Sequence, residues 1–440
     1  MNGTPWRKRV ELCDGRAVCY LGDCRKVLPA LADPFTASVS DPPYGLKFMG
    51  KAWDHGVPGA AFWRAVSKRL LPGAPLLAFG GTRTFHRLMC GIEDAGLTIR
   101  DCLCWLYGSG IPKSHDISKA IDKAAGAERQ TVGRKRVSRD FRTVGLESKR
   151  TMGIDKLCPG LKSSETTVDV TAPATDLARE WNGWGTTLKP AWEPIVLAMK
   201  PNDGTFAANA EAHGVAGLNV DGCRIEGPPW HRRNGKSGAG FNTGKFMGCA
   251  GCGEPTQQYG EREGAGGRWP ANVVLDENAA AMLDEQAGFL KGIGLTGARG
   301  GGKGCTGDPV VFNGGWKPKS RWDSIVDNAG GGASRFFYCA KASRAERTDN
   351  GRVDNRHPTV KPLKLLTWLC RLVAPPKGGR ILDPFMGSGT TALAALATGQ
   401  RFCGIEIDEK YFDVACQRLA DAGPLFTQTR TAAAPQEPTP

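Results

Sequence analysis

Two hydrophobic patterns alternate along the N-terminal third of the chain. Successive side chains of a strand point to opposite faces of the sheet. Short runs in which every second residue is apolar therefore predict strands buried on one face, and short runs in which all residues are apolar predict strands buried on both. Stretches of helix-forming composition lie between them, and one ends at Pro72–Gly73. This alternation indicates βαβ units and a mostly parallel sheet. The predicted elements are a hairpin over residues 9–23 that turns at Asp14–Gly15, helices over 24–31, 60–71 and 84–95, and strands over 35–41, 74–79 and 97–107.

The same pattern returns near the C-terminus after a long interruption. Roughly half of all the glycines lie between residue 200 and residue 335. Glycine-rich stretches with Trp, Arg and Lys form loops more readily than a core, so we expect a separate, irregular region there, with flexible insertions as the alternative. The remaining predicted elements are strands over 195–199, 334–341, 380–383 and 401–408, a helix over 277–286, and helices that end at residues 374, 398 and 422.

The charge of the chain favours a polyanionic partner. Lysine and arginine number 58 against 44 acidic residues, for a net charge of +14. Nucleic acid is the simplest such partner, and a basic protein without one is the alternative. Basic residues cluster with few apolar ones over about 126–175, which predicts either a solvated insertion or a basic loop that lies on phosphates.

The sequence predicts neither a membrane span nor a metal site. No apolar run approaches the ~18 residues that a membrane span needs, and no secretory signal is recognisable, so we expect no membrane association and a cytoplasmic location. The 15 cysteines are scattered, and Cys249–Cys252 is the only CxxC pair. Because a zinc site needs a second pair at matching spacing, we expect free thiols and no metal.

Asp41-Pro42-Pro43-Tyr44 is the first stretch with chemical meaning. It follows the predicted strand over 35–41, and two prolines cannot continue a ladder of hydrogen bonds. The strand therefore ends there and holds an acid and an aromatic ring at its carboxyl end. In open α/β sheets this edge is where ligands bind.

The second stretch with chemical meaning is Asp383-Pro-Phe-Met-Gly-Ser-Gly-Thr390. A strand, a glycine-rich turn and a helix follow one another, which leaves helix-end N–H groups free for a ligand. Another strand ends at Glu406 and Asp408, where an acid typically binds ribose hydroxyls. The turn is neither a complete nicotinamide fingerprint nor a phosphate-binding loop, because no Lys follows Gly389. It predicts a site for a nucleoside cofactor.

Taken together, the two stretches resemble the DNA amino-methyltransferases that use S-adenosylmethionine. Their order, with Asp-Pro-Pro-Tyr first, is similar to the β group of N6-adenine/N4-cytosine enzymes, and so is the segment His357-Pro-Thr-Val-Lys-Pro362. The segments 108–115 and 188–194 resemble phage and prophage members. The resemblance covers about residues 8–125, 180–200 and 335–420. It implies a permuted Rossmann-like methyltransferase fold of the α/β class, with helices on both faces of a mostly parallel sheet.

The resemblance also implies roles for individual residues. Asp41 and the Pro42 carbonyl would accept the two N–H groups of a base amine, and Tyr44 would stack on a base that has left the duplex. Asp23 would lie near the cofactor's adenine, with a helix N-cap as the alternative. Lys361 would lie near the cofactor's carboxylate, with a solvated side chain as the alternative. The residues assigned to the catalytic motif are Asp41, Pro42, Pro43 and Tyr44, and those assigned to the cofactor are Asp23, Thr359, Lys361, Asp383, Pro384, Phe385, Gly387, Gly389, Thr390, Glu406 and Asp408.

These roles divide the chain and define its expected activity. Residues 1–200 would form the catalytic half, 201–334 a target-recognition region, 335–423 the cofactor half and 424–440 a disordered tail. The resemblance implies methylation of double-stranded DNA in a bacterial or phage-infected cytoplasm, and a homodimer is frequent in the group. The acid at position 41 favours adenine N6. Cytosine N4, RNA or protein glutamine as the substrate, and a catalytically silent DNA-binding protein, are the alternatives.

Overall fold

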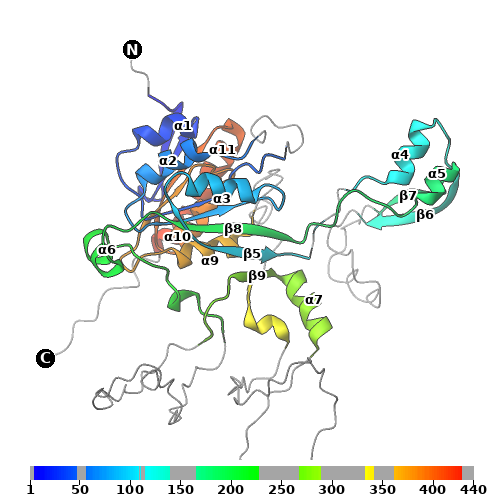
Figure 1. The fold of residues 1–440 in the computed structure, drawn as a ribbon. Coiled ribbons are helices and arrows are strands. Elements are labelled where there is room, and N and C mark those ends of the chain that lie inside the picture. The colour runs from blue at the N-terminus through cyan, green and yellow to red at the C-terminus, as the bar shows by residue number, and fades with distance from the viewer. Residues whose placement is uncertain are drawn as a thin grey trace, which may run out of the picture.

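The computed structural model describes residues 4–46, 56–108, 110, 114–138, 165–226, 267–288, 332–340 and 361–428. Its centre is a ten-stranded sheet in the order β1-β2-β12-β11-β3-β4-β8-β5-β9-β10 (Figure 1). The strands are β1 Lys8–Leu12, β2 Ala17–Leu21, β3 Ala37–Ser40, β4 Pro75–Phe79, β5 Thr98–Leu106, β8 Trp192–Met199, β9 Val273–Asp276, β10 Tyr338–Ala340, β11 Arg380–Asp383 and β12 Arg401–Glu406.

Parallel pairing dominates this sheet. The run from β2 through β12, β11 and β3 to β4 is parallel throughout, and so is the run from β5 through β9 to β10. The exceptions are the β1–β2 hairpin and β8, which runs antiparallel to both β4 and β5. Because β11 from the C-terminal part lies beside β3 from the N-terminal part, the order is that of a permuted sheet. The expected α/β class is confirmed.

Helices cover both faces of the sheet. Along β2, Ala17, Cys19 and Leu21 pack toward one core and Val18 and Tyr20 toward the other, which follows from the two-residue period of a strand. A strand buried on both faces in this way is typical of a parallel sheet between helix layers. The first core includes side chains of α9 Leu363–Leu372, α10 Thr390–Ala397 and α11 Glu409–Gln428, and the second those of α1 Cys24–Val27, α2 Ala60–Arg69 and α3 Phe85–Glu93.

The region expected to be separate belongs partly to the main sheet. Strand β9 pairs with β5 over Cys104–Leu106, and α7 Glu277–Ala287 follows it. Upstream, α6 Phe206–His213 is followed by the short 3₁₀ turn η4 Asp221–Cys223, whose Cys223 is buried in the first core. The expectation of a separate unit over 201–334 is therefore wrong for these segments. Parallel pairing between distant strands has no local sequence signal.

Two smaller boundaries also differ from expectation. The predicted strand over 334–341 begins instead as the 3₁₀ helix η6 Ala333–Phe336, and the strand itself is limited to β10 in the described residues. Helix α11 continues past Pro424 to Gln428, so the start of the expected tail is helical. A proline has a helical φ, and its cost, one hydrogen bond and a clash with the preceding turn, falls near the C-terminal end of this 20-residue helix. Residues 429–440 lie outside the described part.

The predicted basic insertion is bounded by a small lobe that projects from β5 and β8 (Figure 1). It consists of α4 Ile117–Ala124, the antiparallel strands β6 Thr131–Ser138 and β7 Glu165–Thr171, and α5 Asp176–Glu180. Asp122 joins these parts, because its buried carboxylate accepts hydrogen bonds from the amides of Ala174 and Thr175 and is paired with Arg129 at 2.6 Å. We call these four elements the lobe. The interior of the insertion, 139–164, is not described.

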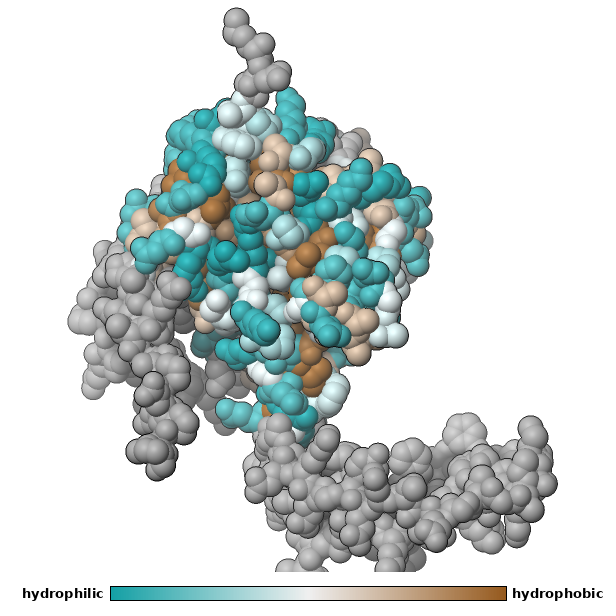
Figure 2. Space-filling view, turned by 90° about the vertical axis from the view of Figure 1, so that its left-hand side faces the viewer, coloured by the Kyte–Doolittle hydropathy of each residue, from teal (hydrophilic) through white to brown (hydrophobic). Residues whose placement is uncertain are grey.

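Apolar side chains are mostly confined to the two cores. On the face drawn in Figure 2, polar residues predominate and the apolar ones occur in small scattered groups. Such scattering is ordinary for a folded chain, and among the described residues visible on this face it marks no docking patch. None of the helices described here is long and apolar enough to cross a membrane.

Candidate functional site

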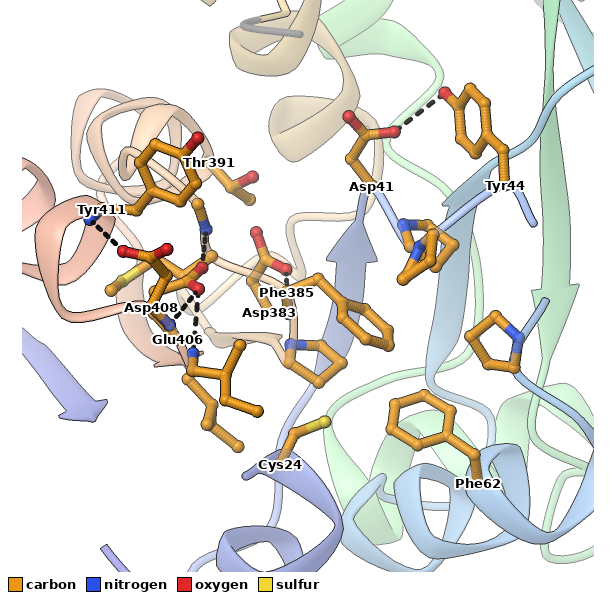
Figure 3. Close-up of a pocket in the computed structure, with 18 of the residues that line it drawn as sticks. Cys24, Asp41, Tyr44, Phe62, Asp383, Phe385, Thr391, Glu406, Asp408 and Tyr411 are labelled. Atoms are coloured by element: carbon orange, nitrogen blue, oxygen red, sulfur yellow. Dashed lines mark hydrogen bonds between the residues drawn. The ribbon is translucent and has the colours of Figure 1, made fainter. Parts of the chain in front are cut away.

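A large pocket opens at the carboxyl ends of β3, β11 and β12. Its volume is about 840 Å³. Figure 3 shows Asp41 and Tyr44 on one side of it and Asp383, Glu406 and Asp408 on the other. Every predicted site residue that the structure describes lines this pocket except Gly389, whereas Thr359 lies outside the described residues. Two stretches more than 300 residues apart in the sequence therefore contribute to one cavity.

Asp41 projects into the pocket directly after β3. The strand ends at Ser40, since neither Pro42 nor Pro43 has an N–H to continue it. The Asp41 carboxylate accepts a hydrogen bond from the Tyr44 hydroxyl at 2.9 Å and is paired with Lys361 at 3.2 Å. Glu193 lies against the same two groups, at 3.1 Å from the Tyr44 hydroxyl and 2.8 Å from the Lys361 ammonium.

The charges of this cluster are only partly balanced. Burial raises the pKa of Asp41, the Lys361 charge lowers it, and the negative charge of Glu193 raises it again. Burial alone would lower the pKa of Lys361, but Asp41 and Glu193 outweigh that effect and raise it, so the ammonium stays charged. Burial, followed by both carboxylates, raises the pKa of Tyr44 well above its usual value, so its hydroxyl remains a donor.

The glycine-rich turn joins β11 to α10 on the other side of the pocket. Gly387 and Gly389 have φ of 56° and 80°, a region that favours glycine. A Cβ on Gly389 would come within 2.9 Å of the Ala415 side chain, so this glycine permits close packing of α11 against the turn and does not line the pocket. Thr390 begins α10, and its hydroxyl accepts a hydrogen bond from Arg418 at 3.1 Å.

Two buried acids flank this turn. The Asp383 carboxylate accepts a hydrogen bond from the amide of Phe385 at 3.0 Å, yet burial raises its pKa to about 7. Burial also raises the pKa of Glu406, although its carboxylate accepts hydrogen bonds from the amides of Gly387, Ile407 and Asp408. Glu406 thus holds the turn and the end of β12 together, with its carboxylate at the pocket wall.

Asp408 and Asp23 sit at helix starts on the rim of the pocket. Asp408 accepts a hydrogen bond from the amide of Lys410 in the first turn of α11. Asp23 is the N-cap of α1, accepts the amide of Arg25, and is paired with the Arg25 guanidinium at 2.7 Å. The hydrogen bond from the Arg25 side chain, with help from its amide, lowers the pKa of Asp23. The N-cap alternative for Asp23 is confirmed, and the residue also lines the pocket.

Two residues differ from what the sequence indicated. The solvated alternative for Lys361 is wrong, since its side chain is 8% exposed and lies against Asp41, Tyr44 and Glu193. Glu193 was not assigned any role, although it is a lone charge at the start of an apolar strand. That signal is weak, because only the register of β8 on β5, which pairs it with Trp105, brings it to the pocket.

Known proteins match only part of the chain. Residues 303–417 match the family model described as DNA methylase, N6_N4_Mtase. The Type II methyltransferase M2.DpnII of Streptococcus pneumoniae is 45% identical over 64 residues, which are 14% of this chain and 24% of that protein. The Type II methyltransferase M.ScaI of Streptomyces caespitosus is 43% identical over 88 residues, which are 20% of this chain and 26% of that protein.

Solved structures resemble the chain only distantly. The M1.HpyAVI–SAM complex aligns at 12% identity and a TM-score of 0.38, over 92% of this chain and 98% of the other. The cytosine-N4-specific PvuII DNA methyltransferase aligns at 10% identity and a TM-score of 0.40, over 96% of each chain. The chain spans about a quarter of the length of the two curated relatives named above. Over residues 303–417, the chain is similar to the N6-adenine/N4-cytosine group of DNA methylases.

Proposed function

We propose that the protein transfers a methyl group from S-adenosylmethionine to the exocyclic amine of a base in double-stranded DNA, with adenine N6 as the target atom. One observation carries this proposal. The acid at the end of β3 and the glycine-rich turn after β11 face a single pocket, on strands that are neighbours in the sheet. A nucleophile held at the first would meet a cofactor held at the second.

The residues around the turn fit S-adenosylmethionine. This cofactor carries a sulfonium, an ammonium and ribose hydroxyls, all of which are bound well by carboxylates. The cofactor side of the pocket offers Asp383, Glu406, Asp408 and Asp23 together with the apolar ring of Phe385. Because burial raises the pKa of Asp383 to about 7, a bound cation would favour its charged form. When bound, the cofactor would supply an electrophilic methyl group.

The opposite wall of the pocket suits an aromatic amine. Such an amine is a weak nucleophile, because its lone pair is conjugated with the ring. Asp41 would accept one N–H and the Pro42 carbonyl the other, which draws electron density to the nitrogen. The amine nitrogen would form a bond to the methyl carbon as the methyl–sulfur bond breaks, and it would afterwards release one proton to solvent, while Asp41 stabilises the positive charge that develops on the nitrogen. The Tyr44 ring provides a face for a base that has left the duplex.

The choice of base rests on the acid at position 41. The chain has Asp in a motif that often begins with Ser in enzymes acting on cytosine N4, so adenine N6 is proposed. The net charge of +14 supports DNA as the polyanionic partner. We further propose the cytoplasm as the site of action. Whether the enzyme acts as a homodimer stays a prediction, as does the phage-like character of residues 108–115 and 188–194.

Analysis of nucleosides from methylated DNA tests the proposed function. Purified protein is incubated with unmethylated duplex DNA and S-adenosylmethionine, and the DNA is digested and assayed for N6-methyladenine and N4-methylcytosine. We expect N6-methyladenine. N4-methylcytosine alone would contradict the proposed base, and methylation of RNA or of a glutamine peptide without methylation of DNA would contradict the proposed substrate.

A further inference from the structure

Glu193 reaches the pocket because β8 runs against its neighbours. Strands β3 and β4 end at the edge of the sheet where the pocket opens, and the antiparallel strand β8 begins there. Glu193 is its second residue, is paired in register with Trp105 of β5, and has a side chain that is 21% exposed. A charged residue at this place is costly unless its partners lie in the pocket.

The partners of Glu193 are also the partners of Asp41. The Tyr44 hydroxyl lies 2.9 Å from one oxygen of Asp41 and 3.1 Å from Glu193 Oε2. The Lys361 ammonium lies 3.2 Å from the other oxygen of Asp41 and 2.8 Å from the same Glu193 oxygen. One hydroxyl and one ammonium group therefore lie between two carboxylates.

This arrangement competes with the chemistry proposed for Asp41. To bind an amine, Asp41 must accept an N–H, and Tyr44 and Lys361 already use one acceptor site on each of its two oxygens. The Tyr44 hydroxyl has a single proton and can give it to only one acceptor at a time. Lys361, which is 8% exposed, cannot lose its negative partners without a large desolvation cost.

We infer that Glu193 is a positioning residue that takes over the Tyr44 hydroxyl and the Lys361 charge when an amine binds Asp41. The inference rests on the proposed function. Tyr44 turns its proton from Asp41 to Glu193, Lys361 remains compensated by Glu193, and the lone pair of Asp41 that accepted the Tyr44 proton becomes available to the amine. Glu193 itself accepts no proton from the substrate.

A change of Glu193 to Gln tests this role with little change in shape. Lys361 would then have Asp41 as its only carboxylate partner in the cluster. It would hold the Asp41 carboxylate away from the amine. Displacement of a reacting group by about 1 Å can cost about a hundredfold in rate. We expect the rate of methyl transfer under single-turnover conditions to fall about tenfold to a hundredfold, while the Kd for S-adenosylmethionine stays unchanged.

The pH profile separates this role from a merely structural one. The groups that face Asp41 are Lys361, Glu193 and Tyr44, with Asp383 across the pocket, and Tyr107, directly after β5, faces Glu193 and Lys361. Removing the negative charge of Glu193 lowers the pKa of Asp41, so the acidic limb of the rate profile shifts to lower pH. Lys361→Met removes the positive charge and shifts that limb to higher pH. Saturating cofactor keeps the titration of Asp383 out of both profiles.

Matched variants make the outcome decisive. Glu93→Gln, an exposed change on α3, should leave the rate and the profile unchanged. In Glu193→Gln/Lys361→Met the two shifts oppose each other, so the acidic limb should return toward that of the wild type. An active wild type together with a fully active Glu193→Gln variant, or with shifts in the same direction for both single variants, overturns the inference and leaves the proposed function standing. If the wild type transfers no methyl group to DNA, the proposed function itself is contradicted.

Discussion

Buried carboxylates at strand ends dominate the chemistry at the scale of single residues. Asp41, Asp383 and Glu406 follow or end three neighbouring strands, and burial raises the pKa of each. A buried acid without a cation is costly, which is acceptable where a ligand supplies the missing charge. Of the three, only Asp41 has a lysine of the described chain at its side. The acids across the pocket are suited to a cationic cofactor.

Asp383 should couple cofactor binding to pH. Its pKa of about 7 lies above the usual value of 3.8, so the carboxyl is partly protonated at neutral pH. A cationic cofactor prefers the carboxylate, and its affinity should therefore rise as pH increases through about 7 and fall toward pH 5. One pKa unit corresponds to about 1.4 kcal/mol, so the change should exceed tenfold. Isothermal titration of S-adenosylmethionine between pH 5 and pH 8.5 measures it.

Asp383→Asn serves as the control for that titration. The amide imitates the protonated acid, so the affinity should be low at every pH and the pH dependence largely lost. The ligand-free variant should also unfold at a higher temperature than the wild type at pH 8 but not at pH 4, because burial destabilises only the charged form. A wild-type affinity that is flat between pH 5 and pH 8.5 would contradict this account of Asp383.

The site could be predicted from sequence where it is local. Asp41 to Tyr44 and the turn after Asp383 are contiguous, and each follows a run with the period of a strand. Glu193 could not be found in this way, because its role arises from the register of β8 and from a lysine 168 residues away. The motif that contains Lys361 is recognisable in the sequence, but the direction of the Lys361 side chain is not. In the structure this side chain faces the acid at position 41.

At the scale of elements, the turn between β11 and α10 depends on close packing against α11. Gly389 has φ of 80°, and a Cβ there would lie 2.9 Å from the Ala415 Cβ and 3.2 Å from its Cα. Gly399 has nearly the same φ, 78°, but a Cβ at that position would have no neighbouring atom within 4 Å among the described residues. A comparison of Gly389 with Gly399 separates backbone strain from crowding. Both positions have a left-handed backbone, but only a Cβ at Gly389 would also be crowded.

Gly389→Ala should therefore destabilise the protein more than Gly399→Ala. A left-handed conformation costs alanine about 1–2 kcal/mol at either position. Crowding against a helix backbone adds about 1–3 kcal/mol at Gly389 alone. Urea unfolding measures both variants, and S-adenosylmethionine affinity should fall only for Gly389→Ala. Equal free energies of unfolding for the two variants would show that α11 does not need this glycine.

The central elements were predictable and the edge of the sheet was not. Hairpin β1–β2, strand β3 and the unit from β11 to β12 follow from local periodicity, and each lies close to its predicted place. Strand β9 was expected in a separate region because glycine-rich sequence surrounds it, yet it pairs with β5. The partner of a parallel strand is chosen by packing far along the chain, which a local pattern does not contain.

At the scale of the whole molecule, the lobe is a unit of its own beside the sheet (Figure 1). Burial would raise the pKa of Asp122, but hydrogen bonds from Ala174 and Thr175, together with Arg129, lower it to about 2. The carboxylate that joins α4 to the segment before α5 therefore stays charged far into the acid range. The lobe should keep its structure while the pH is above about 4 and lose it as the pH falls toward 2.

Asp122→Ala should loosen the lobe and leave the sheet intact. The change removes the carboxylate that accepts from the Ala174 amide and from the amide and hydroxyl of Thr175, and donors left unpaired are costly. Hydrogen exchange of amides in α4, β6, β7 and α5 should become about tenfold faster or more, while β2, β11 and β12 stay protected. Asp176→Asn, which changes a 97% exposed acid on α5, is the matched control. Equal loss of protection in the sheet would show that the lobe is not independent.

Methyl transfer by Asp41→Ala tests the central claim most directly. The measurement is the single-turnover rate of methyl transfer to duplex DNA, together with the Kd for S-adenosylmethionine, for the wild type, Asp41→Ala and the exposed control Asp413→Ala. Loss of the group that stabilises the developing charge should slow transfer by about a hundredfold to a thousandfold or more, with the Kd unchanged within about twofold. The control should match the wild type. An Asp41→Ala variant that transfers methyl groups at the wild-type rate would contradict the account.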